Sequence, residues 1–297
     1  MTTSTPSHLL LALSIAGLDP SGGAGVIANV RTFAAFGVFP TAAVTSVTFQ
    51  NTTGVFGAAH QSAETVRAQV LPIVEDYTVA CAKTGMLPTR EVIVEVARLF
   101  RETNLPAPVV DPVIRSTSGY QLMDEGALES LVKDLLPLAR VVTPNIPEAE
   151  GITGLHINDE EEMRHAAQAI REMGARAVLI KGGHLREQEA VGRRQKAENM
   201  GRGTSRPHSS STDADEKAAL PAEAIDLLDD DGRVKVFRGE WIHAGQIHGT
   251  GCTLSAAIAA CLGGGMSLEE SVLEAKRFVA DAICRAARLG HGARPLV

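Results

Sequence analysis

Residues 9–36 read LLLALSIAGLDPSGGAGVIANVRTFAAF and combine three kinds of local pattern. The first eight residues form an apolar run bounded by glycine and proline, which favours a buried β-strand. A glycine-rich loop follows, and residues 29–36 then carry Val30, Phe33 and Ala34 at the spacing of one helix face. A strand, a glycine loop and a helix in this order predict the first unit of an α/β fold.

The same alternation continues along the chain. Further strands are expected at residues 41–49, 79–83, 108–110, 141–143 and 177–181, and further helices at residues 63–74, 91–100, 124–136, 158–173 and 256–262. Residues 224–228 and 233–237 predict a β-hairpin around a turn at residues 229–232. Ser267 and Glu270 form a capping-box pattern that opens a last helix ending near Gly290. We therefore predict an α/β fold with a mostly parallel central sheet covered by helices on both faces, a three-layer α/β/α sandwich.

The composition is that of a globular protein and limits its partners. The chain has 297 residues, 44% of them hydrophobic and 21% charged, and a formal net charge of −7. This charge argues against a general nucleic-acid or anionic-membrane surface, and we expect binding to neither. The apolar run at residues 9–16 is too short to span a bilayer and has no basic residue before it. The four cysteines show no paired or metal-binding spacing, which favours reduced thiols in a cytoplasmic protein.

We expect residues 1–297 to form one domain with one insertion. Residues 186–219 contain almost no large apolar side chains and are rich in Arg, Ser, Glu and Gly. Such a segment cannot bury enough surface to offset its ordering entropy, which predicts a disordered insertion. A basic regulatory arm is the alternative interpretation.

Polar and glycine residues follow the expected strands at one edge of the sheet, where open α/β sheets bind their ligands. The segments that follow successive strands are residues 17–25, Gln50 with Asn51, residues 84–86, residues 111–113, residues 144–148 and residues 182–184. Six such segments in register predict a binding site at this edge.

The glycines at residues 22–25 permit a close approach of backbone to ligand or, alternatively, a tight turn without one. Residues 23–28 match a loose dinucleotide pattern, which leaves an NAD(P)-dependent oxidoreductase as a remote alternative. Against it, Gln50 stands where that fold places an acidic residue at the end of the second strand. The phosphate loop G-x-x-x-x-G-K-[ST] is absent from the sequence.

A second glycine motif, His248-Gly249-Thr250-Gly251-Cys252, leads into the expected small-residue helix at 256–262. Two glycines at a helix start expose N–H groups along the helix dipole and suit a transferring phosphoryl group. In the first turn, the dipole is expected to lower the pKa of Cys252 and favour a thiolate that accepts the proton of an attacking hydroxyl. The alternative is an inert small residue at a helix start.

Residues 143–148 add a pattern suited to hydrated Mg²⁺ and phosphate. Asn145 and Glu148 can serve the ion, and Asp111 can contribute another carboxylate, because Mg²⁺ takes few protein ligands and keeps several waters. Alternatively, Asn145 caps the next helix and Glu148 lies in its first turn. Lys181 is either a nucleotide contact or a surface lysine, and Met86 either touches the substrate or packs in the core.

Taken together, these segments resemble the hydroxymethylpyrimidine/phosphomethylpyrimidine kinases of thiamine biosynthesis, in the ribokinase superfamily. The resemblance runs from about Leu10 to Gly292. The motifs that carry it are AGLDPSGGAG at 16–25, QNT at 50–52, KTGML at 83–87, DPV at 111–113, TPNIPEA at 143–149, KGGH at 181–184 and HGTGCT at 248–253. It implies a ribokinase-like fold, a homodimer and the cofactors ATP and Mg²⁺.

The resemblance also implies roles for residues. Gln50 would hydrogen-bond the pyrimidine and Met86 would pack on the ring, with Gly17, Asp19, Asn29 and Val113 also on the substrate side. Gly249, Thr250 and Gly251 would form the anion hole, and Cys252 would stand where sugar kinases of the superfamily carry Asp. Asn145, Lys181 and Thr250 would bind the nucleotide, and Asp111 and Glu148 would bind the metal.

The implied activity is ATP-dependent phosphorylation of 4-amino-5-hydroxymethyl-2-methylpyrimidine and of its monophosphate. A pyridoxal or pyridoxine kinase on the same fold is the alternative, and a sensor that binds the pyrimidine without turnover is a further one. The chain departs from the family pattern in three places, the mildest of which is the flap at residues 114–119. It reads Ile27-Ala28-Asn29 where the family usually has Gln-Ala-Asp, and residues 186–219 lengthen the segment after His184.

Overall fold

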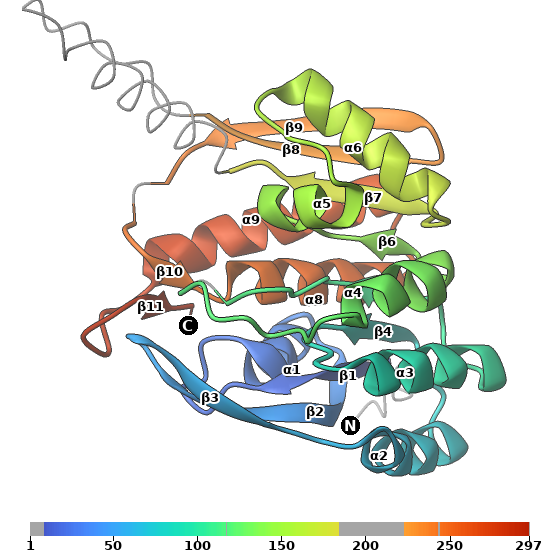
Figure 1. The fold of residues 1–297 in the computed structure, drawn as a ribbon. Coiled ribbons are helices and arrows are strands. Elements are labelled where there is room, and N and C mark those ends of the chain that lie inside the picture. The colour runs from blue at the N-terminus through green and yellow to red at the C-terminus, as the bar shows by residue number, and fades with distance from the viewer. Residues whose placement is uncertain (1–8, 117, 184–222, 243, 297) are drawn as a thin grey trace, which may run out of the picture.

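A computed structural model describes residues 9–116, 118–183, 223–242 and 244–296 (Figure 1). The predicted insertion at residues 186–219, together with His184, lies outside these described residues. The strands are β1 (Leu11–Leu18), β2 (Phe39–Asn51), β3 (Gly54–His60), β4 (Cys81–Thr84), β5 (Val109–Val110), β6 (Val141–Val142), β7 (Ala177–Lys181), β8 (Glu223–Asp230), β9 (Arg233–Glu240), β10 (Ile247–His248) and β11 (Arg294–Pro295). The helices are α1 (Gly25–Ala35), α2 (Ala63–Asp76), α3 (Arg90–Glu102), α4 (Ala127–Ser130), α5 (Ile146–Thr153), α6 (Glu160–Glu172), α8 (Thr250–Gly263) and α9 (Leu268–Arg285).

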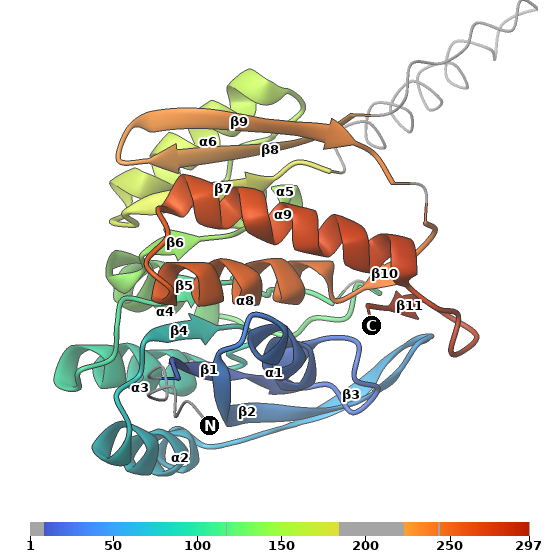
Figure 2. The ribbon, with the colours of Figure 1, turned by 180° about the vertical axis from the view of Figure 1, so that it is seen from behind.

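One sheet with strand order β3-β2-β1-β4-β5-β6-β7-β8-β9 runs through the described part of the molecule. In the order of the sheet, β2, β1, β4, β5, β6 and β7 pair in parallel, whereas β3, β8 and β9 pair antiparallel to their neighbours. Helices α2 to α6 cover one face, and α1, α8 and α9 cover the other, as the two opposite views show (Figures 1 and 2). The predicted three-layer sandwich with a mostly parallel sheet is confirmed.

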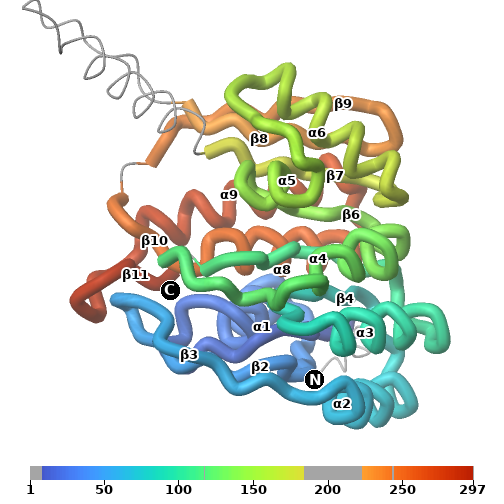
Figure 3. Tube along the Cα trace, in the orientation of Figure 1, coloured from blue at the N-terminus to red at the C-terminus, as the bar shows by residue number. Residues whose placement is uncertain are grey.

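The two faces of β1 explain why its sequence is apolar almost throughout. Leu13 and Ile15 are fully buried in the core beneath α2 and α3, whereas Ala12 is buried in the core beneath α1 and α8. A central parallel strand meets helices on both sides, so it lacks the alternation of a half-exposed strand. Helix α8, far along the chain, packs beside α1 against this second face (Figure 3).

Several elements differ from the predictions; α8, for example, begins at Thr250 and not at residue 256. Strand β3 was not predicted, because Gly57, Ala58 and Ala59 give its sequence no clear β pattern, and it makes Gln50 part of a β2–β3 hairpin instead of a residue after a strand. The helix expected at 124–136 begins only at Ala127 and continues as a π-turn and a 3₁₀-turn, because Gly126 is left-handed (φ 81°) and Pro137 follows. The last helix ends at Arg285, five residues before the expected Gly290.

Candidate active site

Asp19 anchors the loop between β1 and α1 and contacts the second glycine loop. Its Oδ1 accepts hydrogen bonds from the N–H and Oγ of Ser21, at 2.8 and 2.7 Å, and its Oδ2 accepts one from the Ala24 N–H at 2.9 Å. His248 Nε2 lies 2.9 Å from the same Oδ2. Burial raises the pKa of Asp19, but hydrogen bonds from His248 and Ser21 outweigh it and lower the pKa to about 2. The carboxylate predicted to face the substrate is therefore occupied by donors of the protein itself.

This network predicts a pH-dependent contribution to stability. Because the folded-state pKa of Asp19 lies below its ordinary value of 3.8, the stabilisation is present above about pH 4 and is lost as the pH falls toward about 2. We expect Asp19→Asn to lower the free energy of unfolding by about 1–2 kcal/mol at pH 7, after allowance for solvent screening. Urea unfolding at pH 7, 4 and 3 measures the difference. Asp281→Asn, at an exposed position of α9, is the control, and a pH-independent difference for Asp19→Asn would contradict the expectation.

The two glycine loops pack backbone against backbone. Gly249, the N-cap of α8, has φ 88°, and a Cβ on it would lie 1.8 Å from the carbonyl oxygen of Gly23. A Cβ on Gly23 would in turn lie 2.4 Å from Cδ2 of His248. Glycine is required at both positions by contact, and at Gly249 also by the left-handed backbone. The first turn of α8 is thus held directly against the loop that follows β1.

Gln50 lies beside this junction. Its Nε2 is 3.3 Å from His248 Nε2, and His248 immediately precedes the N-cap of α8. The end of β2 and the turn that carries Cys252 therefore border the same loop, as a shared site requires. Met86 is buried just after β4, where a Cβ on Gly17 at the end of β1 would lie 2.8 Å from its Sδ.

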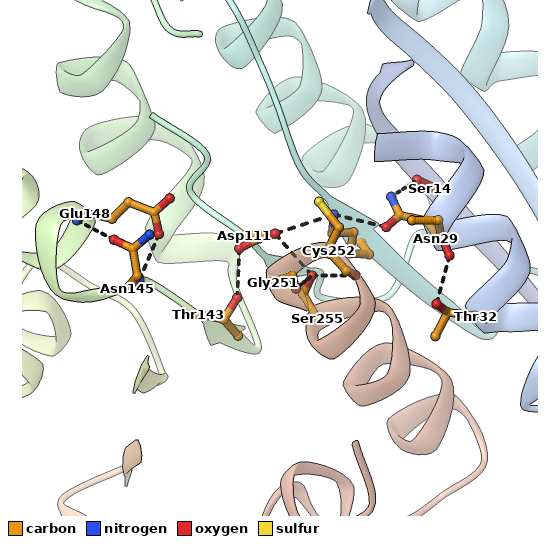
Figure 4. A network of polar contacts seen from close by, with 12 residues as sticks. Ser14, Asn29, Thr32, Asp111, Thr143, Asn145, Glu148, Gly251, Cys252 and Ser255 are labelled. Atoms are coloured by element: carbon orange, nitrogen blue, oxygen red, sulfur yellow. Dashed lines mark hydrogen bonds and ion pairs between the residues drawn. The ribbon is translucent and has the colours of Figure 1, made fainter. Parts of the chain in front are cut away.

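Cys252 lies in the first turn of α8, between Asp111 and Asn29 in the close view (Figure 4). Burial raises the pKa of its thiol above the ordinary value, and Asp111 raises it further, whereas Lys83, the Gly25 N–H and Lys181 lower it. This direction is opposite to the lowering expected from the helix dipole, because desolvation by burial is the largest effect.

Asp111, directly after β5, is held by two lysines. Its Oδ1 accepts a hydrogen bond from Lys181 Nζ at 3.1 Å, and its Oδ2 lies 3.7 Å from Lys83 Nζ. Thr143 and Ser255 donate to it at 3.4 and 3.3 Å. Burial raises the pKa of Asp111, but the lysines outweigh that effect and lower it. Val113 donates its N–H to the Asp111 carbonyl at 2.9 Å and so lies in the same short turn.

Lys83 is a site residue whose role the sequence reasoning missed. It is fully buried at the end of β4, and its Nζ lies 3.4 Å from Asn29 Oδ1. Asn29 also donates to Ser14 Oγ at 2.8 Å, so its amide joins the lysine to β1. A lysine inside an apolar strand was the available signal, since buried lysines are almost always paired. An aspartate at position 29 would be an ionic partner of Lys83, whereas Asn29 is a neutral one.

Asn145 and Glu148 form a capping box at the start of α5. Asn145 Oδ1 accepts from the Glu148 N–H, and Glu148 Oε2 accepts from the Asn145 N–H, both at 2.8 Å. Lys181 Nζ lies 3.9 Å from Glu148 Oε2 and 3.1 Å from Asp111. Burial, together with the neighbouring Asp111, raises the pKa of Glu148 to about 7 against the opposing effect of Lys181. The capping alternative is confirmed, and Lys181 is an inward-facing residue and not a surface lysine.

The donor set suits a magnesium ion that is carried by a nucleotide. Among the described residues, no three His, Cys, Asp or Glu side chains are grouped to hold a metal by themselves. A nucleotide-borne Mg²⁺ needs only one or two carboxylates, because phosphates and water supply the rest. Glu148 fits this requirement, since a buried carboxyl with a raised pKa gains most from a nearby cation. Direct ligation by Asp111 is opposed by its two lysine partners.

Comparison with known proteins gives a consistent result. The family model for phosphomethylpyrimidine kinase matches residues 19–202 and 214–297. A hydroxymethylpyrimidine/phosphomethylpyrimidine kinase of Rhizobium meliloti is 42% identical over 289 residues, which cover 96% of each chain.

Two solved structures share the fold. The phosphomethylpyrimidine kinase from Clostridium difficile is 34% identical with a TM-score of 0.72 and covers 92% of this chain and 99% of its own. The pyridoxal kinase from Staphylococcus aureus, in complex with AMP-PCP and pyridoxal, is 29% identical with a TM-score of 0.78 and covers 97% and 93%. The match over nearly the whole length, on a ribokinase-like fold that brings two glycine loops together at one sheet edge, places this chain in the phosphomethylpyrimidine kinase family.

Proposed function

We propose that this protein transfers the γ-phosphoryl group of ATP to the hydroxymethyl group of 4-amino-5-hydroxymethyl-2-methylpyrimidine, and then to the resulting monophosphate, in thiamine biosynthesis. Membership of the kinase family supports phosphoryl transfer from ATP. The observation that carries the assignment is the contact between Gln50 and His248, which brings a ring-reading amide to the turn that bears Cys252.

The substrate side is formed by residues around β1, β2 and β4. Gln50 reads the pyrimidine edge through its amide, which has both a donor and an acceptor. Met86 and Gly17, which touch each other, pack on the ring, and Val113 closes the same side. Asn29 acts through Lys83 and Ser14, to which it is hydrogen-bonded. Asp19 acts through His248 and the glycine loop.

The phosphate side is formed by the start of α8 and by β7. N–H groups of Gly249, Thr250 and Gly251 at the helix N-terminus face the transferring group and stabilise its negative charge. Lys181 and Asn145 hold the nucleotide phosphates, with Lys181 placed by Asp111. Glu148 would hold a nucleotide-borne Mg²⁺ through its water ligands, and the ion would supply neutralisation of phosphate charge. Asp111 contributes its charge through the lysines.

The reaction is an in-line displacement. The hydroxymethyl oxygen forms a bond to the γ-phosphorus, the bond from that phosphorus to the β–γ bridging oxygen breaks, and ADP leaves with the electron pair. The thiolate form of Cys252 takes the hydroxyl proton. Phosphoryl transfer depends mainly on positioning and charge stabilisation, so a base that is only partly ionised still suffices.

A pyridoxal kinase is the second candidate, because solved pyridoxal kinases share this fold at a TM-score of 0.78. The deciding measurement is kcat/KM for the hydroxymethylpyrimidine and for pyridoxal on the purified full-length chain. We expect the pyrimidine to be preferred by roughly tenfold or more, because the Gln50 amide matches an amino-substituted ring edge. A preference of the same size for pyridoxal would overturn the assignment.

We also propose that the protein is a cytoplasmic homodimer. No helix in the described parts of the chain is long and apolar enough to cross a membrane.

Phe49 and Phe56 are 54% and 68% exposed on the β2–β3 hairpin at the sheet edge. Exposed aromatic side chains on an edge hairpin favour a protein partner, and a second copy of the chain is the one we propose.

A further inference from the structure

We propose that Asp19 and His248 fix the orientation of the Gln50 amide and thereby select a ligand edge that offers a hydrogen-bond acceptor beside a donor. The inference rests on the proposed function, since it concerns the substrate that the same site accepts. Asp19 and His248 are positioning residues in this account, and Gln50 is the residue that touches the ring.

The Asp19 carboxylate can only accept hydrogen bonds when it is ionised. Its two oxygens are held by three donors of Ser21 and Ala24, at 2.7 to 2.9 Å, so the group cannot turn away from its loop. The side chain is 4% exposed, and its lowered pKa keeps it ionised at neutral pH. The Asp19 carboxylate is therefore a fixed, ionised acceptor, and it is the first member of the series Asp19, His248 and Gln50.

This fixed acceptor determines which ring nitrogen of His248 carries a hydrogen. His248 Nε2 lies 2.9 Å from Asp19 Oδ2, which is a hydrogen bond only if Nε2 carries a hydrogen. This holds for the imidazolium and for the Nε2–H tautomer, so the conclusion does not depend on the charge of His248. Its Nε2 is a donor in both states.

The Gln50 amide contacts the same histidine nitrogen, and its Nε2 lies 3.3 Å from His248 Nε2. Two N–H groups cannot hydrogen-bond to each other. A half-turn about the last side-chain bond exchanges Nε2 and Oε1 without changing the shape of the amide, and amide orientation is assigned by such partners. Oε1 therefore faces the histidine and accepts a second, weaker share of the Nε2–H.

This orientation defines what Gln50 offers to a ring. Oε1 keeps one lone pair for a ligand donor, and the NH₂ group beside it presents a hydrogen to a ligand acceptor. A 4-aminopyrimidine has the complementary edge, with the ring N3 as acceptor and the 4-amino group as donor. The corresponding 4-oxopyrimidine has the reverse edge, an N3–H donor beside a carbonyl acceptor, and nearly the same shape.

The test compares these two rings on the full-length protein. Calorimetric titration without nucleotide gives Kd for 4-amino-5-hydroxymethyl-2-methylpyrimidine and for its 4-oxo analogue. We expect the wild type to bind the amino form roughly a hundredfold more tightly, because the reversed edge leaves buried polar groups unpaired. In Asp19→Asn we expect the ratio of the two Kd values to fall to about tenfold or less. The introduced amide can donate to His248 as well as accept from it, so neither the His248 proton nor the Gln50 orientation is fixed.

Two further variants separate orientation from general structural damage. Ser21→Ala removes one donor to Asp19 but leaves the carboxylate facing His248, so we expect both Kd values to change by the same factor. Gln50→Glu leaves an amide-shaped group that only accepts, so either ring edge then meets one partner and one mismatch, and we expect the affinity ratio to fall to about tenfold or less. This second variant keeps the test valid if Asp19→Asn does not fold.

A Kd ratio near one in the wild type, or a ratio that Asp19→Asn and Gln50→Glu leave unchanged, would overturn the inference. Because binding is measured without nucleotide, absence of phosphoryl transfer to either pyrimidine would count against the proposed function alone. The ratio of the two affinities would still be measured.

Discussion

Replacing Cys252 by Ala is expected to lower kcat for the hydroxymethylpyrimidine by roughly 10²- to 10⁴-fold, the range for loss of a positioned general base. The KM and the Kd for the ring should change little, because in the proposed site Gln50 and Met86, and not Cys252, bind the ring. Steady-state kinetics and calorimetric titration on the same preparation measure both. Cys284→Ala is the matched control, since Cys284 is an exposed cysteine on α9.

The pH profile gives this prediction a direction. A base acts in its deprotonated form, and burial raises the pKa of Cys252 above its ordinary value. The kcat of the wild type should therefore still be rising with pH in the alkaline range, and the residual kcat of Cys252→Ala should lack this rise. Full turnover in Cys252→Ala would remove the base role while leaving the fold and family intact.

Local patterns predicted the architecture because each strand and helix carries its own periodicity. The run around Leu13 and Ile15 is apolar on both faces, and that is what a central parallel strand requires. The order of glycine and polar segments at strand ends likewise predicted that the two glycine loops meet at one sheet edge, since parallel strands end there. Strand β3 could not be predicted in the same way, because pairing with β2, and not its own composition, makes it a strand.

What the sequence could not predict depends on contacts between distant segments. Lys83 meets Asn29 and Asp111, which lie on a helix and on another strand end, so its burial and partners exist only in the folded chain. The thiol of Cys252 shows the same limit. Its place in a first helical turn was readable, but the desolvation that outweighs the dipole comes from the elements packed around it.

Asn145 and Glu148 form a motif for which one of two interpretations, the helix cap, is confirmed. Their capping box was a stated alternative, and the reciprocal bonds at 2.8 Å establish it. The same bonds leave Glu148 Oε2 3.9 Å from Lys181 Nζ. The helix cap therefore fixes the carboxylate beside the lysine to which we assign the nucleotide phosphates.

Gly249→Ala is expected to damage both stability and catalysis. An added Cβ would lie 1.8 Å from the Gly23 carbonyl oxygen, a backbone atom that cannot rotate away, at a residue with φ 88°. Left-handed strain costs roughly 1–2 kcal/mol and a forced shift of packed backbone about 1–3 kcal/mol more. Thermal unfolding should show a Tm lower by roughly 6 °C or more at this chain length. Displacement of the helix N-terminus should lower kcat by about a hundredfold, as for loss of an oxyanion donor.

Gly265→Ala is the control that introduces left-handed backbone strain without a contact between the two glycine loops. Gly265 lies just after the C-terminal end of α8. Gly265 also has φ 88°, but a Cβ there would meet nothing within 4 Å. Only backbone strain remains, so we expect a Tm loss of about 2–4 °C with unchanged kcat. Equal losses of Tm in the two variants, with kcat intact in both, would show that the β1–α1 loop and the start of α8 are not locked together. Loss of kcat in Gly249→Ala alone would tie phosphoryl transfer to the contact between the two glycine loops.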